Sequence, residues 1–143
     1  MGILGTFAET IFDVNLIVQL LLVVILALGF YKRRRFATHG RIMALATLIN
    51  LGAIALVMVP SLIINFGAIV AAPFSPGVLI TIAHGILGST AIVLGSLFSV
   101  RFLIATRNAQ PLACGTRWMM ISTILLWLFA LVGGLAFYSF YYL

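Results

Sequence analysis

Four long apolar runs divide the chain, and short segments with polar or charged residues separate them. The runs cover about 13–31, 41–63, 78–104 and 117–140. Each run is long enough to cross a bilayer, which takes about 20 mostly apolar residues. Backbone N–H and C=O groups need internal partners in lipid, so the runs are predicted to be helices and not strands. The pattern predicts an all-α membrane protein in which residues 1–143 form a single membrane domain, a four-transmembrane-helix antiparallel bundle.

The ends of the runs carry local signals for where helices begin. Thr38 is a suitable N-cap for the second helix, and Ser75-Pro76 suits the start of the third because proline fits the first helical turn. Residues 1–12 are too short and too mixed to span a bilayer, so they are predicted to form a short segment on the outer interface. Residues 65–75 are predicted to be an apolar connection on the same outer side.

Charge indicates the orientation of the four helices. Hydrophobic residues make up 64% of the chain and charged residues only 7%, against about 25% in soluble domains. Cytoplasmic connections are enriched in Lys and Arg, so the distribution predicts a cell-membrane protein with both chain ends outside and both basic connections in the cytoplasm. The basic residues lie at membrane boundaries, where they suit anionic lipid or an acidic partner and not nucleic acid. They are Lys32, Arg33, Arg34, Arg35, Arg41, Arg101, Arg107 and Arg117.

Polar residues inside the runs form an expected outer cluster. Asn15 and Gln19 are four residues apart and share one face of the first helix. His84 could reach that face if the first and third helices are neighbours, and Asn50 on the second helix could extend the cluster. One interpretation is hydrogen bonding that fixes helix packing, worth about 0.6 kcal/mol per pair. The other is a haem, quinone or metal site that uses His84, with Asn15 and Gln19 beside it.

A second expected cluster lies at the inner ends of the helices. An imidazole with soft sulfur ligands suits Cu(I), although methionine is also a routine filler of irregular apolar gaps. Its members are His39, Met43, Cys114, Met119 and Met120. His39 is also a candidate metal or cofactor ligand on its own, or simply a residue at headgroup level. Its depth differs from that of His84 by about 15–20 Å, which disfavours one haem held by both histidines.

Small residues also mark the third run, where Gly85, Gly88, Gly95 and Ser99 lie close to one stripe. Such a stripe is typical of close helix packing in lipid, and it would also leave room for a flat ligand such as haem. The sequence identifies no cofactor: haem is one candidate and copper a weaker one.

Catalytic constellations are absent from the sequence. Glu9 and Asp13 are the only acidic residues, and both precede or begin the first run. A general acid–base enzyme or a proton-coupled transporter needs a carboxylate deeper in the bundle, so neither is expected. Arg101 lies near the end of the third run with no acidic residue on its side, which leaves it available to lipid headgroups, a haem propionate or an acidic partner.

Short motifs in all four runs resemble a small prokaryotic family of membrane proteins. The similar segments are Asn15, Tyr31 with the basic run after it, "ATHGRIMALAT" at 37–47, the stretch 83–105 and the stretch 123–138. Together they resemble the domain of unknown function 420 family, of the CtaM/YozB type, over about residues 13–140. That family is linked to the assembly of haem-copper cytochrome oxidases.

The resemblance implies that His39 and His84 match two family histidines at the starts of the second and third helices. A further family histidine, at the start of the fourth helix, is missing here, where the sequence reads Gly115-Thr116-Arg117. Three functions stay open. They are a non-enzymatic accessory or assembly protein of a respiratory haem-copper oxidase, a haem- or quinone-binding redox protein that uses His84, and a structural small subunit of another membrane complex.

Overall fold

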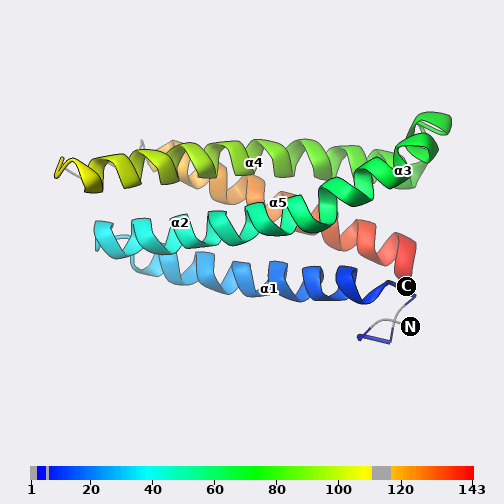
Figure 1. Cartoon of the computed structure of the whole chain (residues 1–143), viewed down its shortest axis with the longest axis horizontal. Coiled ribbons are helices and arrows are strands. Elements are labelled where there is room, and N and C mark those ends of the chain that lie inside the picture. The colour runs from blue at the N-terminus through cyan, green and yellow to red at the C-terminus, as the bar shows by residue number, and fades with distance from the viewer. Residues whose placement is uncertain (1–2, 6, 111–116) are drawn as a thin grey trace.

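The computed structural model describes residues 3–5, 7–110 and 117–143, apart from the Arg117 side chain, and in this part of the chain it is helical and contains no strand. Figure 1 shows the helices lying alongside one another, with both chain ends at the same end of the molecule. They are α1 (Thr10–Tyr31), α2 (Phe36–Ala53), the π-helical turn η1 (Ile54–Met58), α3 (Val59–Ala71), α4 (Pro76–Arg107) and α5 (Arg117–Tyr142).

Four stretches of these helices are long and apolar enough to cross a membrane, as predicted. They are Thr10–Tyr31, Phe36–Ala71, Pro76–Arg107 and Trp118–Tyr142. The chain therefore has the character of a multi-pass membrane protein. The second stretch combines α2, η1 and α3 into one long helical path.

The order of helices around the bundle follows from their packing. In the described residues α1 packs on α2, α2 on α4, α4 on α5, and α5 more lightly on α1. The pairs α1–α2 and α4–α5 are hairpins of antiparallel neighbours, as short connections favour. Leu22, Leu26, Ala46, Ala91 and Trp127 form the buried core where these helices meet. The first and third spans are thus diagonal to each other and not neighbours.

The second span corrects two predictions from the sequence, the Thr38 N-cap and the connection 65–75. It begins at Phe36, so Thr38 lies inside the helix and is not its N-cap. It continues to Ala71, so most of the predicted connection 65–75 is helical. The Asn65 side chain donates to the Ser61 carbonyl of its own helix at 2.8 Å, which satisfies its polar group within the helix. The path ends after Ala71, because Ala72 precedes Pro73 and a residue before proline is disfavoured in the α conformation.

The start of α4 is confirmed. The Ser75 hydroxyl accepts from the Val78 backbone N–H at 3.4 Å, and Pro76 occupies the first turn. The Ser-Pro pair therefore caps the helix by the chemistry that the sequence predicted.

The first helix begins three residues earlier than predicted, at Thr10, so residues 10–12 belong to α1 and not to a separate interfacial segment.

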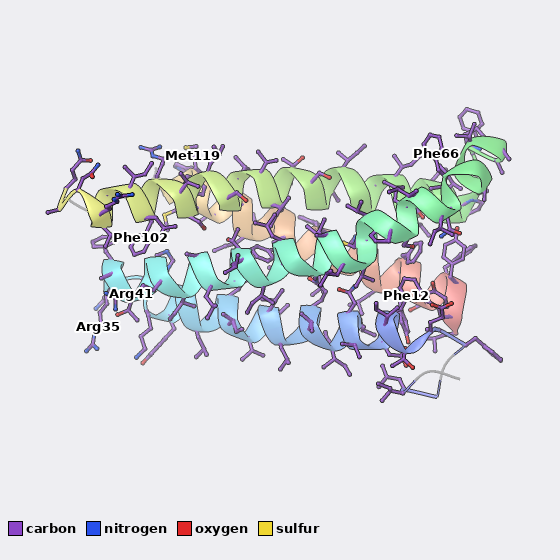
Figure 2. The ribbon with its side chains drawn as sticks, in the orientation of Figure 1. Phe12, Arg35, Arg41, Phe66, Phe102 and Met119 are labelled. Atoms are coloured by element: carbon purple, nitrogen blue, oxygen red, sulfur yellow. The ribbon has the colours of Figure 1, made fainter. Side chains whose placement is uncertain are left out.

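The two ends of the bundle differ in charge. The basic end carries the α1–α2 turn and the end of α4, and Figure 2 shows Arg35 and Arg41 projecting there. The terminal end, where both chain ends lie, carries the acidic residues (Figure 1). Asp13 is fully buried at this end and accepts hydrogen bonds from the Leu4 backbone N–H and the Tyr138 hydroxyl. These bonds tie the N-terminal segment and α5 to α1.

Candidate functional site at the basic end

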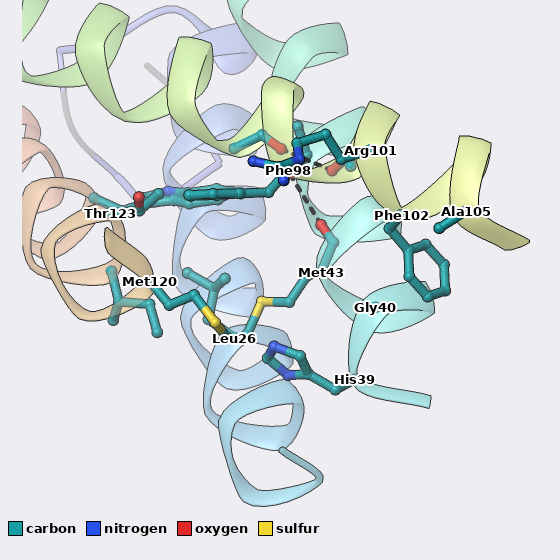
Figure 3. Close-up of a pocket in the computed structure, with 15 residues that line it drawn as sticks. Leu26, His39, Gly40, Met43, Phe98, Arg101, Phe102, Ala105, Met120 and Thr123 are labelled. Carbon is teal, nitrogen blue, oxygen red and sulfur yellow. Dashed lines mark hydrogen bonds between the residues drawn. The ribbon is translucent and has the colours of Figure 1, made fainter. Parts of the chain in front are cut away.

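A cavity of about 90 Å³ opens between α1, α2, α4 and α5 near the basic end (Figure 3). That volume corresponds to a few water molecules or a small ion with its ligands. This cavity is too small for a porphyrin ring with its side chains as they stand. Its apolar walls are Leu26, Phe98, Phe102, Ala105, Ile124 and Trp127.

His39 is the central polar residue of this cavity. Only 4% of it is exposed, and its Nδ1 lies 2.8 Å from the Gly29 carbonyl oxygen of α1. A carbonyl can only accept, so Nδ1 carries the hydrogen. In the neutral ring Nε2 then keeps its lone pair. The glycine allows this close approach, because the neighbouring Met43 side chain occupies the space where a Cβ on Gly29 would lie.

Two methionines line the same cavity. Met43 lies one turn after His39 on α2, and Met120 comes from α5. In Figure 3 their side chains extend toward each other, with the His39 ring beside them. Met119, which the sequence had grouped with them, is 44% exposed and does not line the cavity. Cys114, the remaining member of the expected inner cluster, lies outside the described residues.

The hydroxyl groups of the cavity present lone pairs to its interior. Thr47, Ser99 and Thr123 each donate to the carbonyl four residues earlier in their own helix, at 2.9, 2.8 and 2.8 Å. Each hydroxyl hydrogen is thereby committed, and only the oxygen lone pairs remain. The cavity lining thus offers several lone pairs, and Arg101 at its edge is the cationic donor among the residues that line it.

The expected outer cluster is divided by the structure. Gln19 donates to the Asn50 side-chain oxygen at 3.0 Å, which links α1 to α2. The buried Oδ1 of Asn15 has no hydrogen-bond partner. His84 lies away from these residues, because α1 and α4 are diagonal. The extension to Asn50 is confirmed, and the meeting of His84 with Asn15 and Gln19 is not observed.

His84 packs against α5. Its Nδ1 lies 2.7 Å from the Ala130 carbonyl oxygen, and its ring contacts the glycine pair Gly133-Gly134. A Cβ on Gly134 would lie 3.1 Å from the His84 ring carbon Cε1, so the glycine leaves the space that the imidazole fills. His84 does not line the cavity that holds His39. Its observed role is to join two helices.

The small residues of α4 differ in their surroundings: some pack against a neighbouring helix beside the cavity, and another has open space next to it. Gly95 faces Thr47 of α2, with the Thr47 hydroxyl oxygen 3.3 Å from where a Cβ would lie, and both Gly95 and Ser99 line the cavity. A Cβ on Gly85 would meet nothing within 4 Å. Half of the stripe is therefore a packing seam that also borders the cavity.

Sequence reasoning missed the aromatic part of the site. Phe102 lies over Gly40, next to His39, and a Cβ on Gly40 would overlap its ring. Gly40, directly after His39, is a residue that permits such close packing, but which aromatic side chain packs on it depends on the order of the helices.

The chain matches no protein-family model, no curated protein and no solved structure.

Among the described residues, no group of three or more His, Cys, Asp or Glu side chains could hold a metal ion. The donor set around His39 consists instead of one imidazole, two thioethers and three hydroxyl oxygens. This arrangement can bind a small electron-poor ligand. It contains no carboxylate for general acid–base chemistry.

Proposed function

We propose that this chain is a non-enzymatic membrane accessory or assembly protein of a respiratory haem-copper oxidase, and that the His39 cavity is its working site. The observation that carries the proposal is the held tautomer of His39, with Nδ1 bound to the Gly29 carbonyl and Nε2 left as an acceptor in a cavity. An imidazole held in this tautomer can bind a ligand through Nε2 without first changing its orientation. The resemblance to the oxidase-assembly family supplies the partner.

The orientation belongs to the same proposal. The basic end lies in the cytoplasm and the terminal end outside the cell membrane, because cytoplasmic connections are enriched in Lys and Arg. The cavity, which lies near the basic end, is then on the cytoplasmic side. Arg35, Arg41 and Arg107 lie at the same end of the bundle, where anionic lipid or an acidic partner would be favoured.

Gene deletion and complementation test this function. We expect deletion to lower the haem content and activity of the oxidase in isolated membranes, and the wild-type chain to restore both. His39→Ala should fail to restore them although it accumulates in the membrane. His84→Ala is the matched control, since it removes an imidazole with the same type of backbone contact outside the cavity. Normal oxidase content in the deletion strain would refute the proposal.

One observation favours a second candidate, a structural subunit of a larger membrane complex. In the described residues α3 continues from η1 but packs extensively on no other helix. Its Ile63, Ile64 and Phe66 side chains are largely exposed. Exposed apolar surface in a span contacts lipid or a partner helix. Copurification with large partners at a fixed ratio would support this candidate, and a stable lone monomer in mild detergent would count against it.

A further inference from the structure

The donors in the His39 cavity come from three helices, α2, α4 and α5, and line the same space. Gly29 of α1 joins them: its carbonyl accepts from His39 Nδ1, and the Met43 sulfur lies 3.4 Å from where a Gly29 Cβ would be. The imidazole is therefore bound to Gly29, and the thioether fills the space that the missing Gly29 side chain leaves. Met120 lines the cavity from α5 and extends toward Met43 in Figure 3.

The tautomer of His39 is the one that metal ligands commonly have. Metal-binding histidines usually donate their second ring N–H to a carboxylate or a backbone carbonyl, which fixes the ring and directs the other nitrogen to the metal. The Gly29 carbonyl provides this contact at 2.8 Å. His39 Nε2 is then a donor of fixed orientation inside the cavity.

We infer that the cavity binds a soft monovalent metal ion, Cu(I), through His39 Nε2 and the sulfurs of Met43 and Met120. Thioether and imidazole donors suit Cu(I), whereas zinc and iron sites draw on thiolate, carboxylate and multiple imidazole ligands. No cluster of three His, Cys, Asp or Glu residues exists in the described residues to serve those metals.

The surrounding groups agree with a bound cation. The Thr47, Ser99 and Thr123 hydroxyls direct lone pairs and not hydrogens toward the interior, because each hydrogen is donated within its own helix. The three proposed ligands are neutral, so the metal keeps its single positive charge. Arg101 at the cavity edge then favours an anionic fourth ligand, such as chloride or a donor's thiolate.

The alternative is that the two methionines only fill an irregular gap, as methionine often does. The two accounts differ in what a conservative substitution does. Met→Leu preserves volume and usually costs little in stability, but it removes the sulfur donor. Under the packing account, Met43→Leu and Met120→Leu would leave metal affinity unchanged.

Competition with the chromophoric Cu(I) chelator bicinchoninate, on the full chain in mild detergent under reducing conditions, tests the inference. We expect one Cu(I) per chain. Met43→Leu, Met120→Leu and His39→Ala should each weaken binding by more than about tenfold. Met119→Leu is the matched control, since it removes an adjacent sulfur that does not line the cavity, and it should leave affinity unchanged. Thermal unfolding of each variant shows whether it is folded.

X-ray absorption of the Cu(I) complex gives an independent signature. The expected first shell contains two sulfur donors and one nitrogen donor, and it should lose one sulfur in Met120→Leu. Three results would overturn the inference: no binding by the folded wild-type chain, equal affinity in Met120→Leu and Met119→Leu, or loss of binding only in Cys114→Ser. The last would place copper on the thiol.

The inference rests on the proposed function for the claim that the cavity is the working site, but the experiments separate them. Copper binding that follows these variants, together with normal oxidase in the deletion strain, would refute the oxidase role alone. Loss of oxidase in the deletion strain without copper binding would refute only the metal.

Discussion

At the level of single residues, the contact between Gly40 and Phe102 holds α2 against α4. A Cβ on Gly40 would lie 2.2 Å from the nearest ring carbon of Phe102, closer than carbon atoms can approach. Gly40→Ala should therefore push the ring aside and destabilise the bundle by about 1–3 kcal/mol, the usual effect of overpacking. Thermal or denaturant unfolding in detergent measures the change.

Gly52 is the matched control on the same helix. A Cβ there meets nothing within 4 Å, so Gly52→Ala should be neutral or stabilising by about 0.5–1 kcal/mol through its helix propensity. Adding Phe102→Leu to Gly40→Ala should recover part of the loss, because the smaller side chain makes room. Equal effects of the two glycine substitutions would contradict this account of the contact.

The sequence identified both histidines but not what each one contacts. His39 and His84 each hold a backbone carbonyl on a neighbouring helix, Gly29 and Ala130 respectively. Those partners depend on which helices are adjacent, and the sequence does not determine that order. The same limit applies to Met119 and Met120. Consecutive helical residues point about 100° apart, so only the packed structure decides that Met120 enters the cavity.

At the level of helices, the span Phe36–Ala71 shows where sequence reasoning stopped short. About 20 residues suffice to cross the bilayer, so the predicted second helix was ended at 63, where that length had been reached. The structure extends it to 36 residues, about 54 Å if straight, because the π-helical turn η1 accommodates Pro60 and the path continues until Pro73. Pro60 does not end the helix, since η1 directly precedes it. In η1 the Val59 N–H bonds to the Ile54 carbonyl five residues earlier.

Pro60 explains the π-helical turn. A proline has no N–H to donate, and its ring clashes with the carbonyl four residues earlier, so the widened turn relieves both problems. Figure 1 shows the path changing direction between α2 and α3. The bend carries α3 away from the other helices, and it leaves the α3 part of this span exposed. In this chain a proline bends a spanning helix without breaking it.

Pro60→Ala should restore a regular helix, because the new N–H can bond to the Leu56 carbonyl. We expect the α2–α3 bend to decrease. Spin labels at the exposed positions Leu45 and Ile64, in a Cys114→Ser background, should then approach the roughly 28 Å expected across 19 residues of straight helix. Val59→Ala, in the same turn, should leave the label distance unchanged. An unchanged distance in Pro60→Ala would show that packing and not proline sets the bend.

For the whole molecule, the sequence predicted the number of spans, their antiparallel arrangement and the common end of the termini. It could not predict how that end is closed. In the sequence Asp13 was one of two acidic residues that precede or begin the first run, yet in the structure it is buried against Tyr138 and the Leu4 backbone. These partners are 125 and 9 residues away, so periodicity gives no sign of them. Glu9 and Asp13 both lie at the start of α1, at the end of the bundle opposite the basic α1–α2 turn.

The resulting charge asymmetry makes a prediction for the complete molecule in its membrane. Phe74 is 85% exposed in the connection between α3 and α4, at the terminal end, whereas Asn108 follows α4 at the basic end. In a Cys114→Ser background, a membrane-impermeant maleimide should label Phe74→Cys in intact spheroplasts and Asn108→Cys only after lysis. The physical reason is that a basic connection resists translocation, whereas the connection around Phe74 carries no charge. The reverse labelling would place the His39 cavity on the outer side, and the anionic fourth ligand of its metal would then have to come from outside the cell.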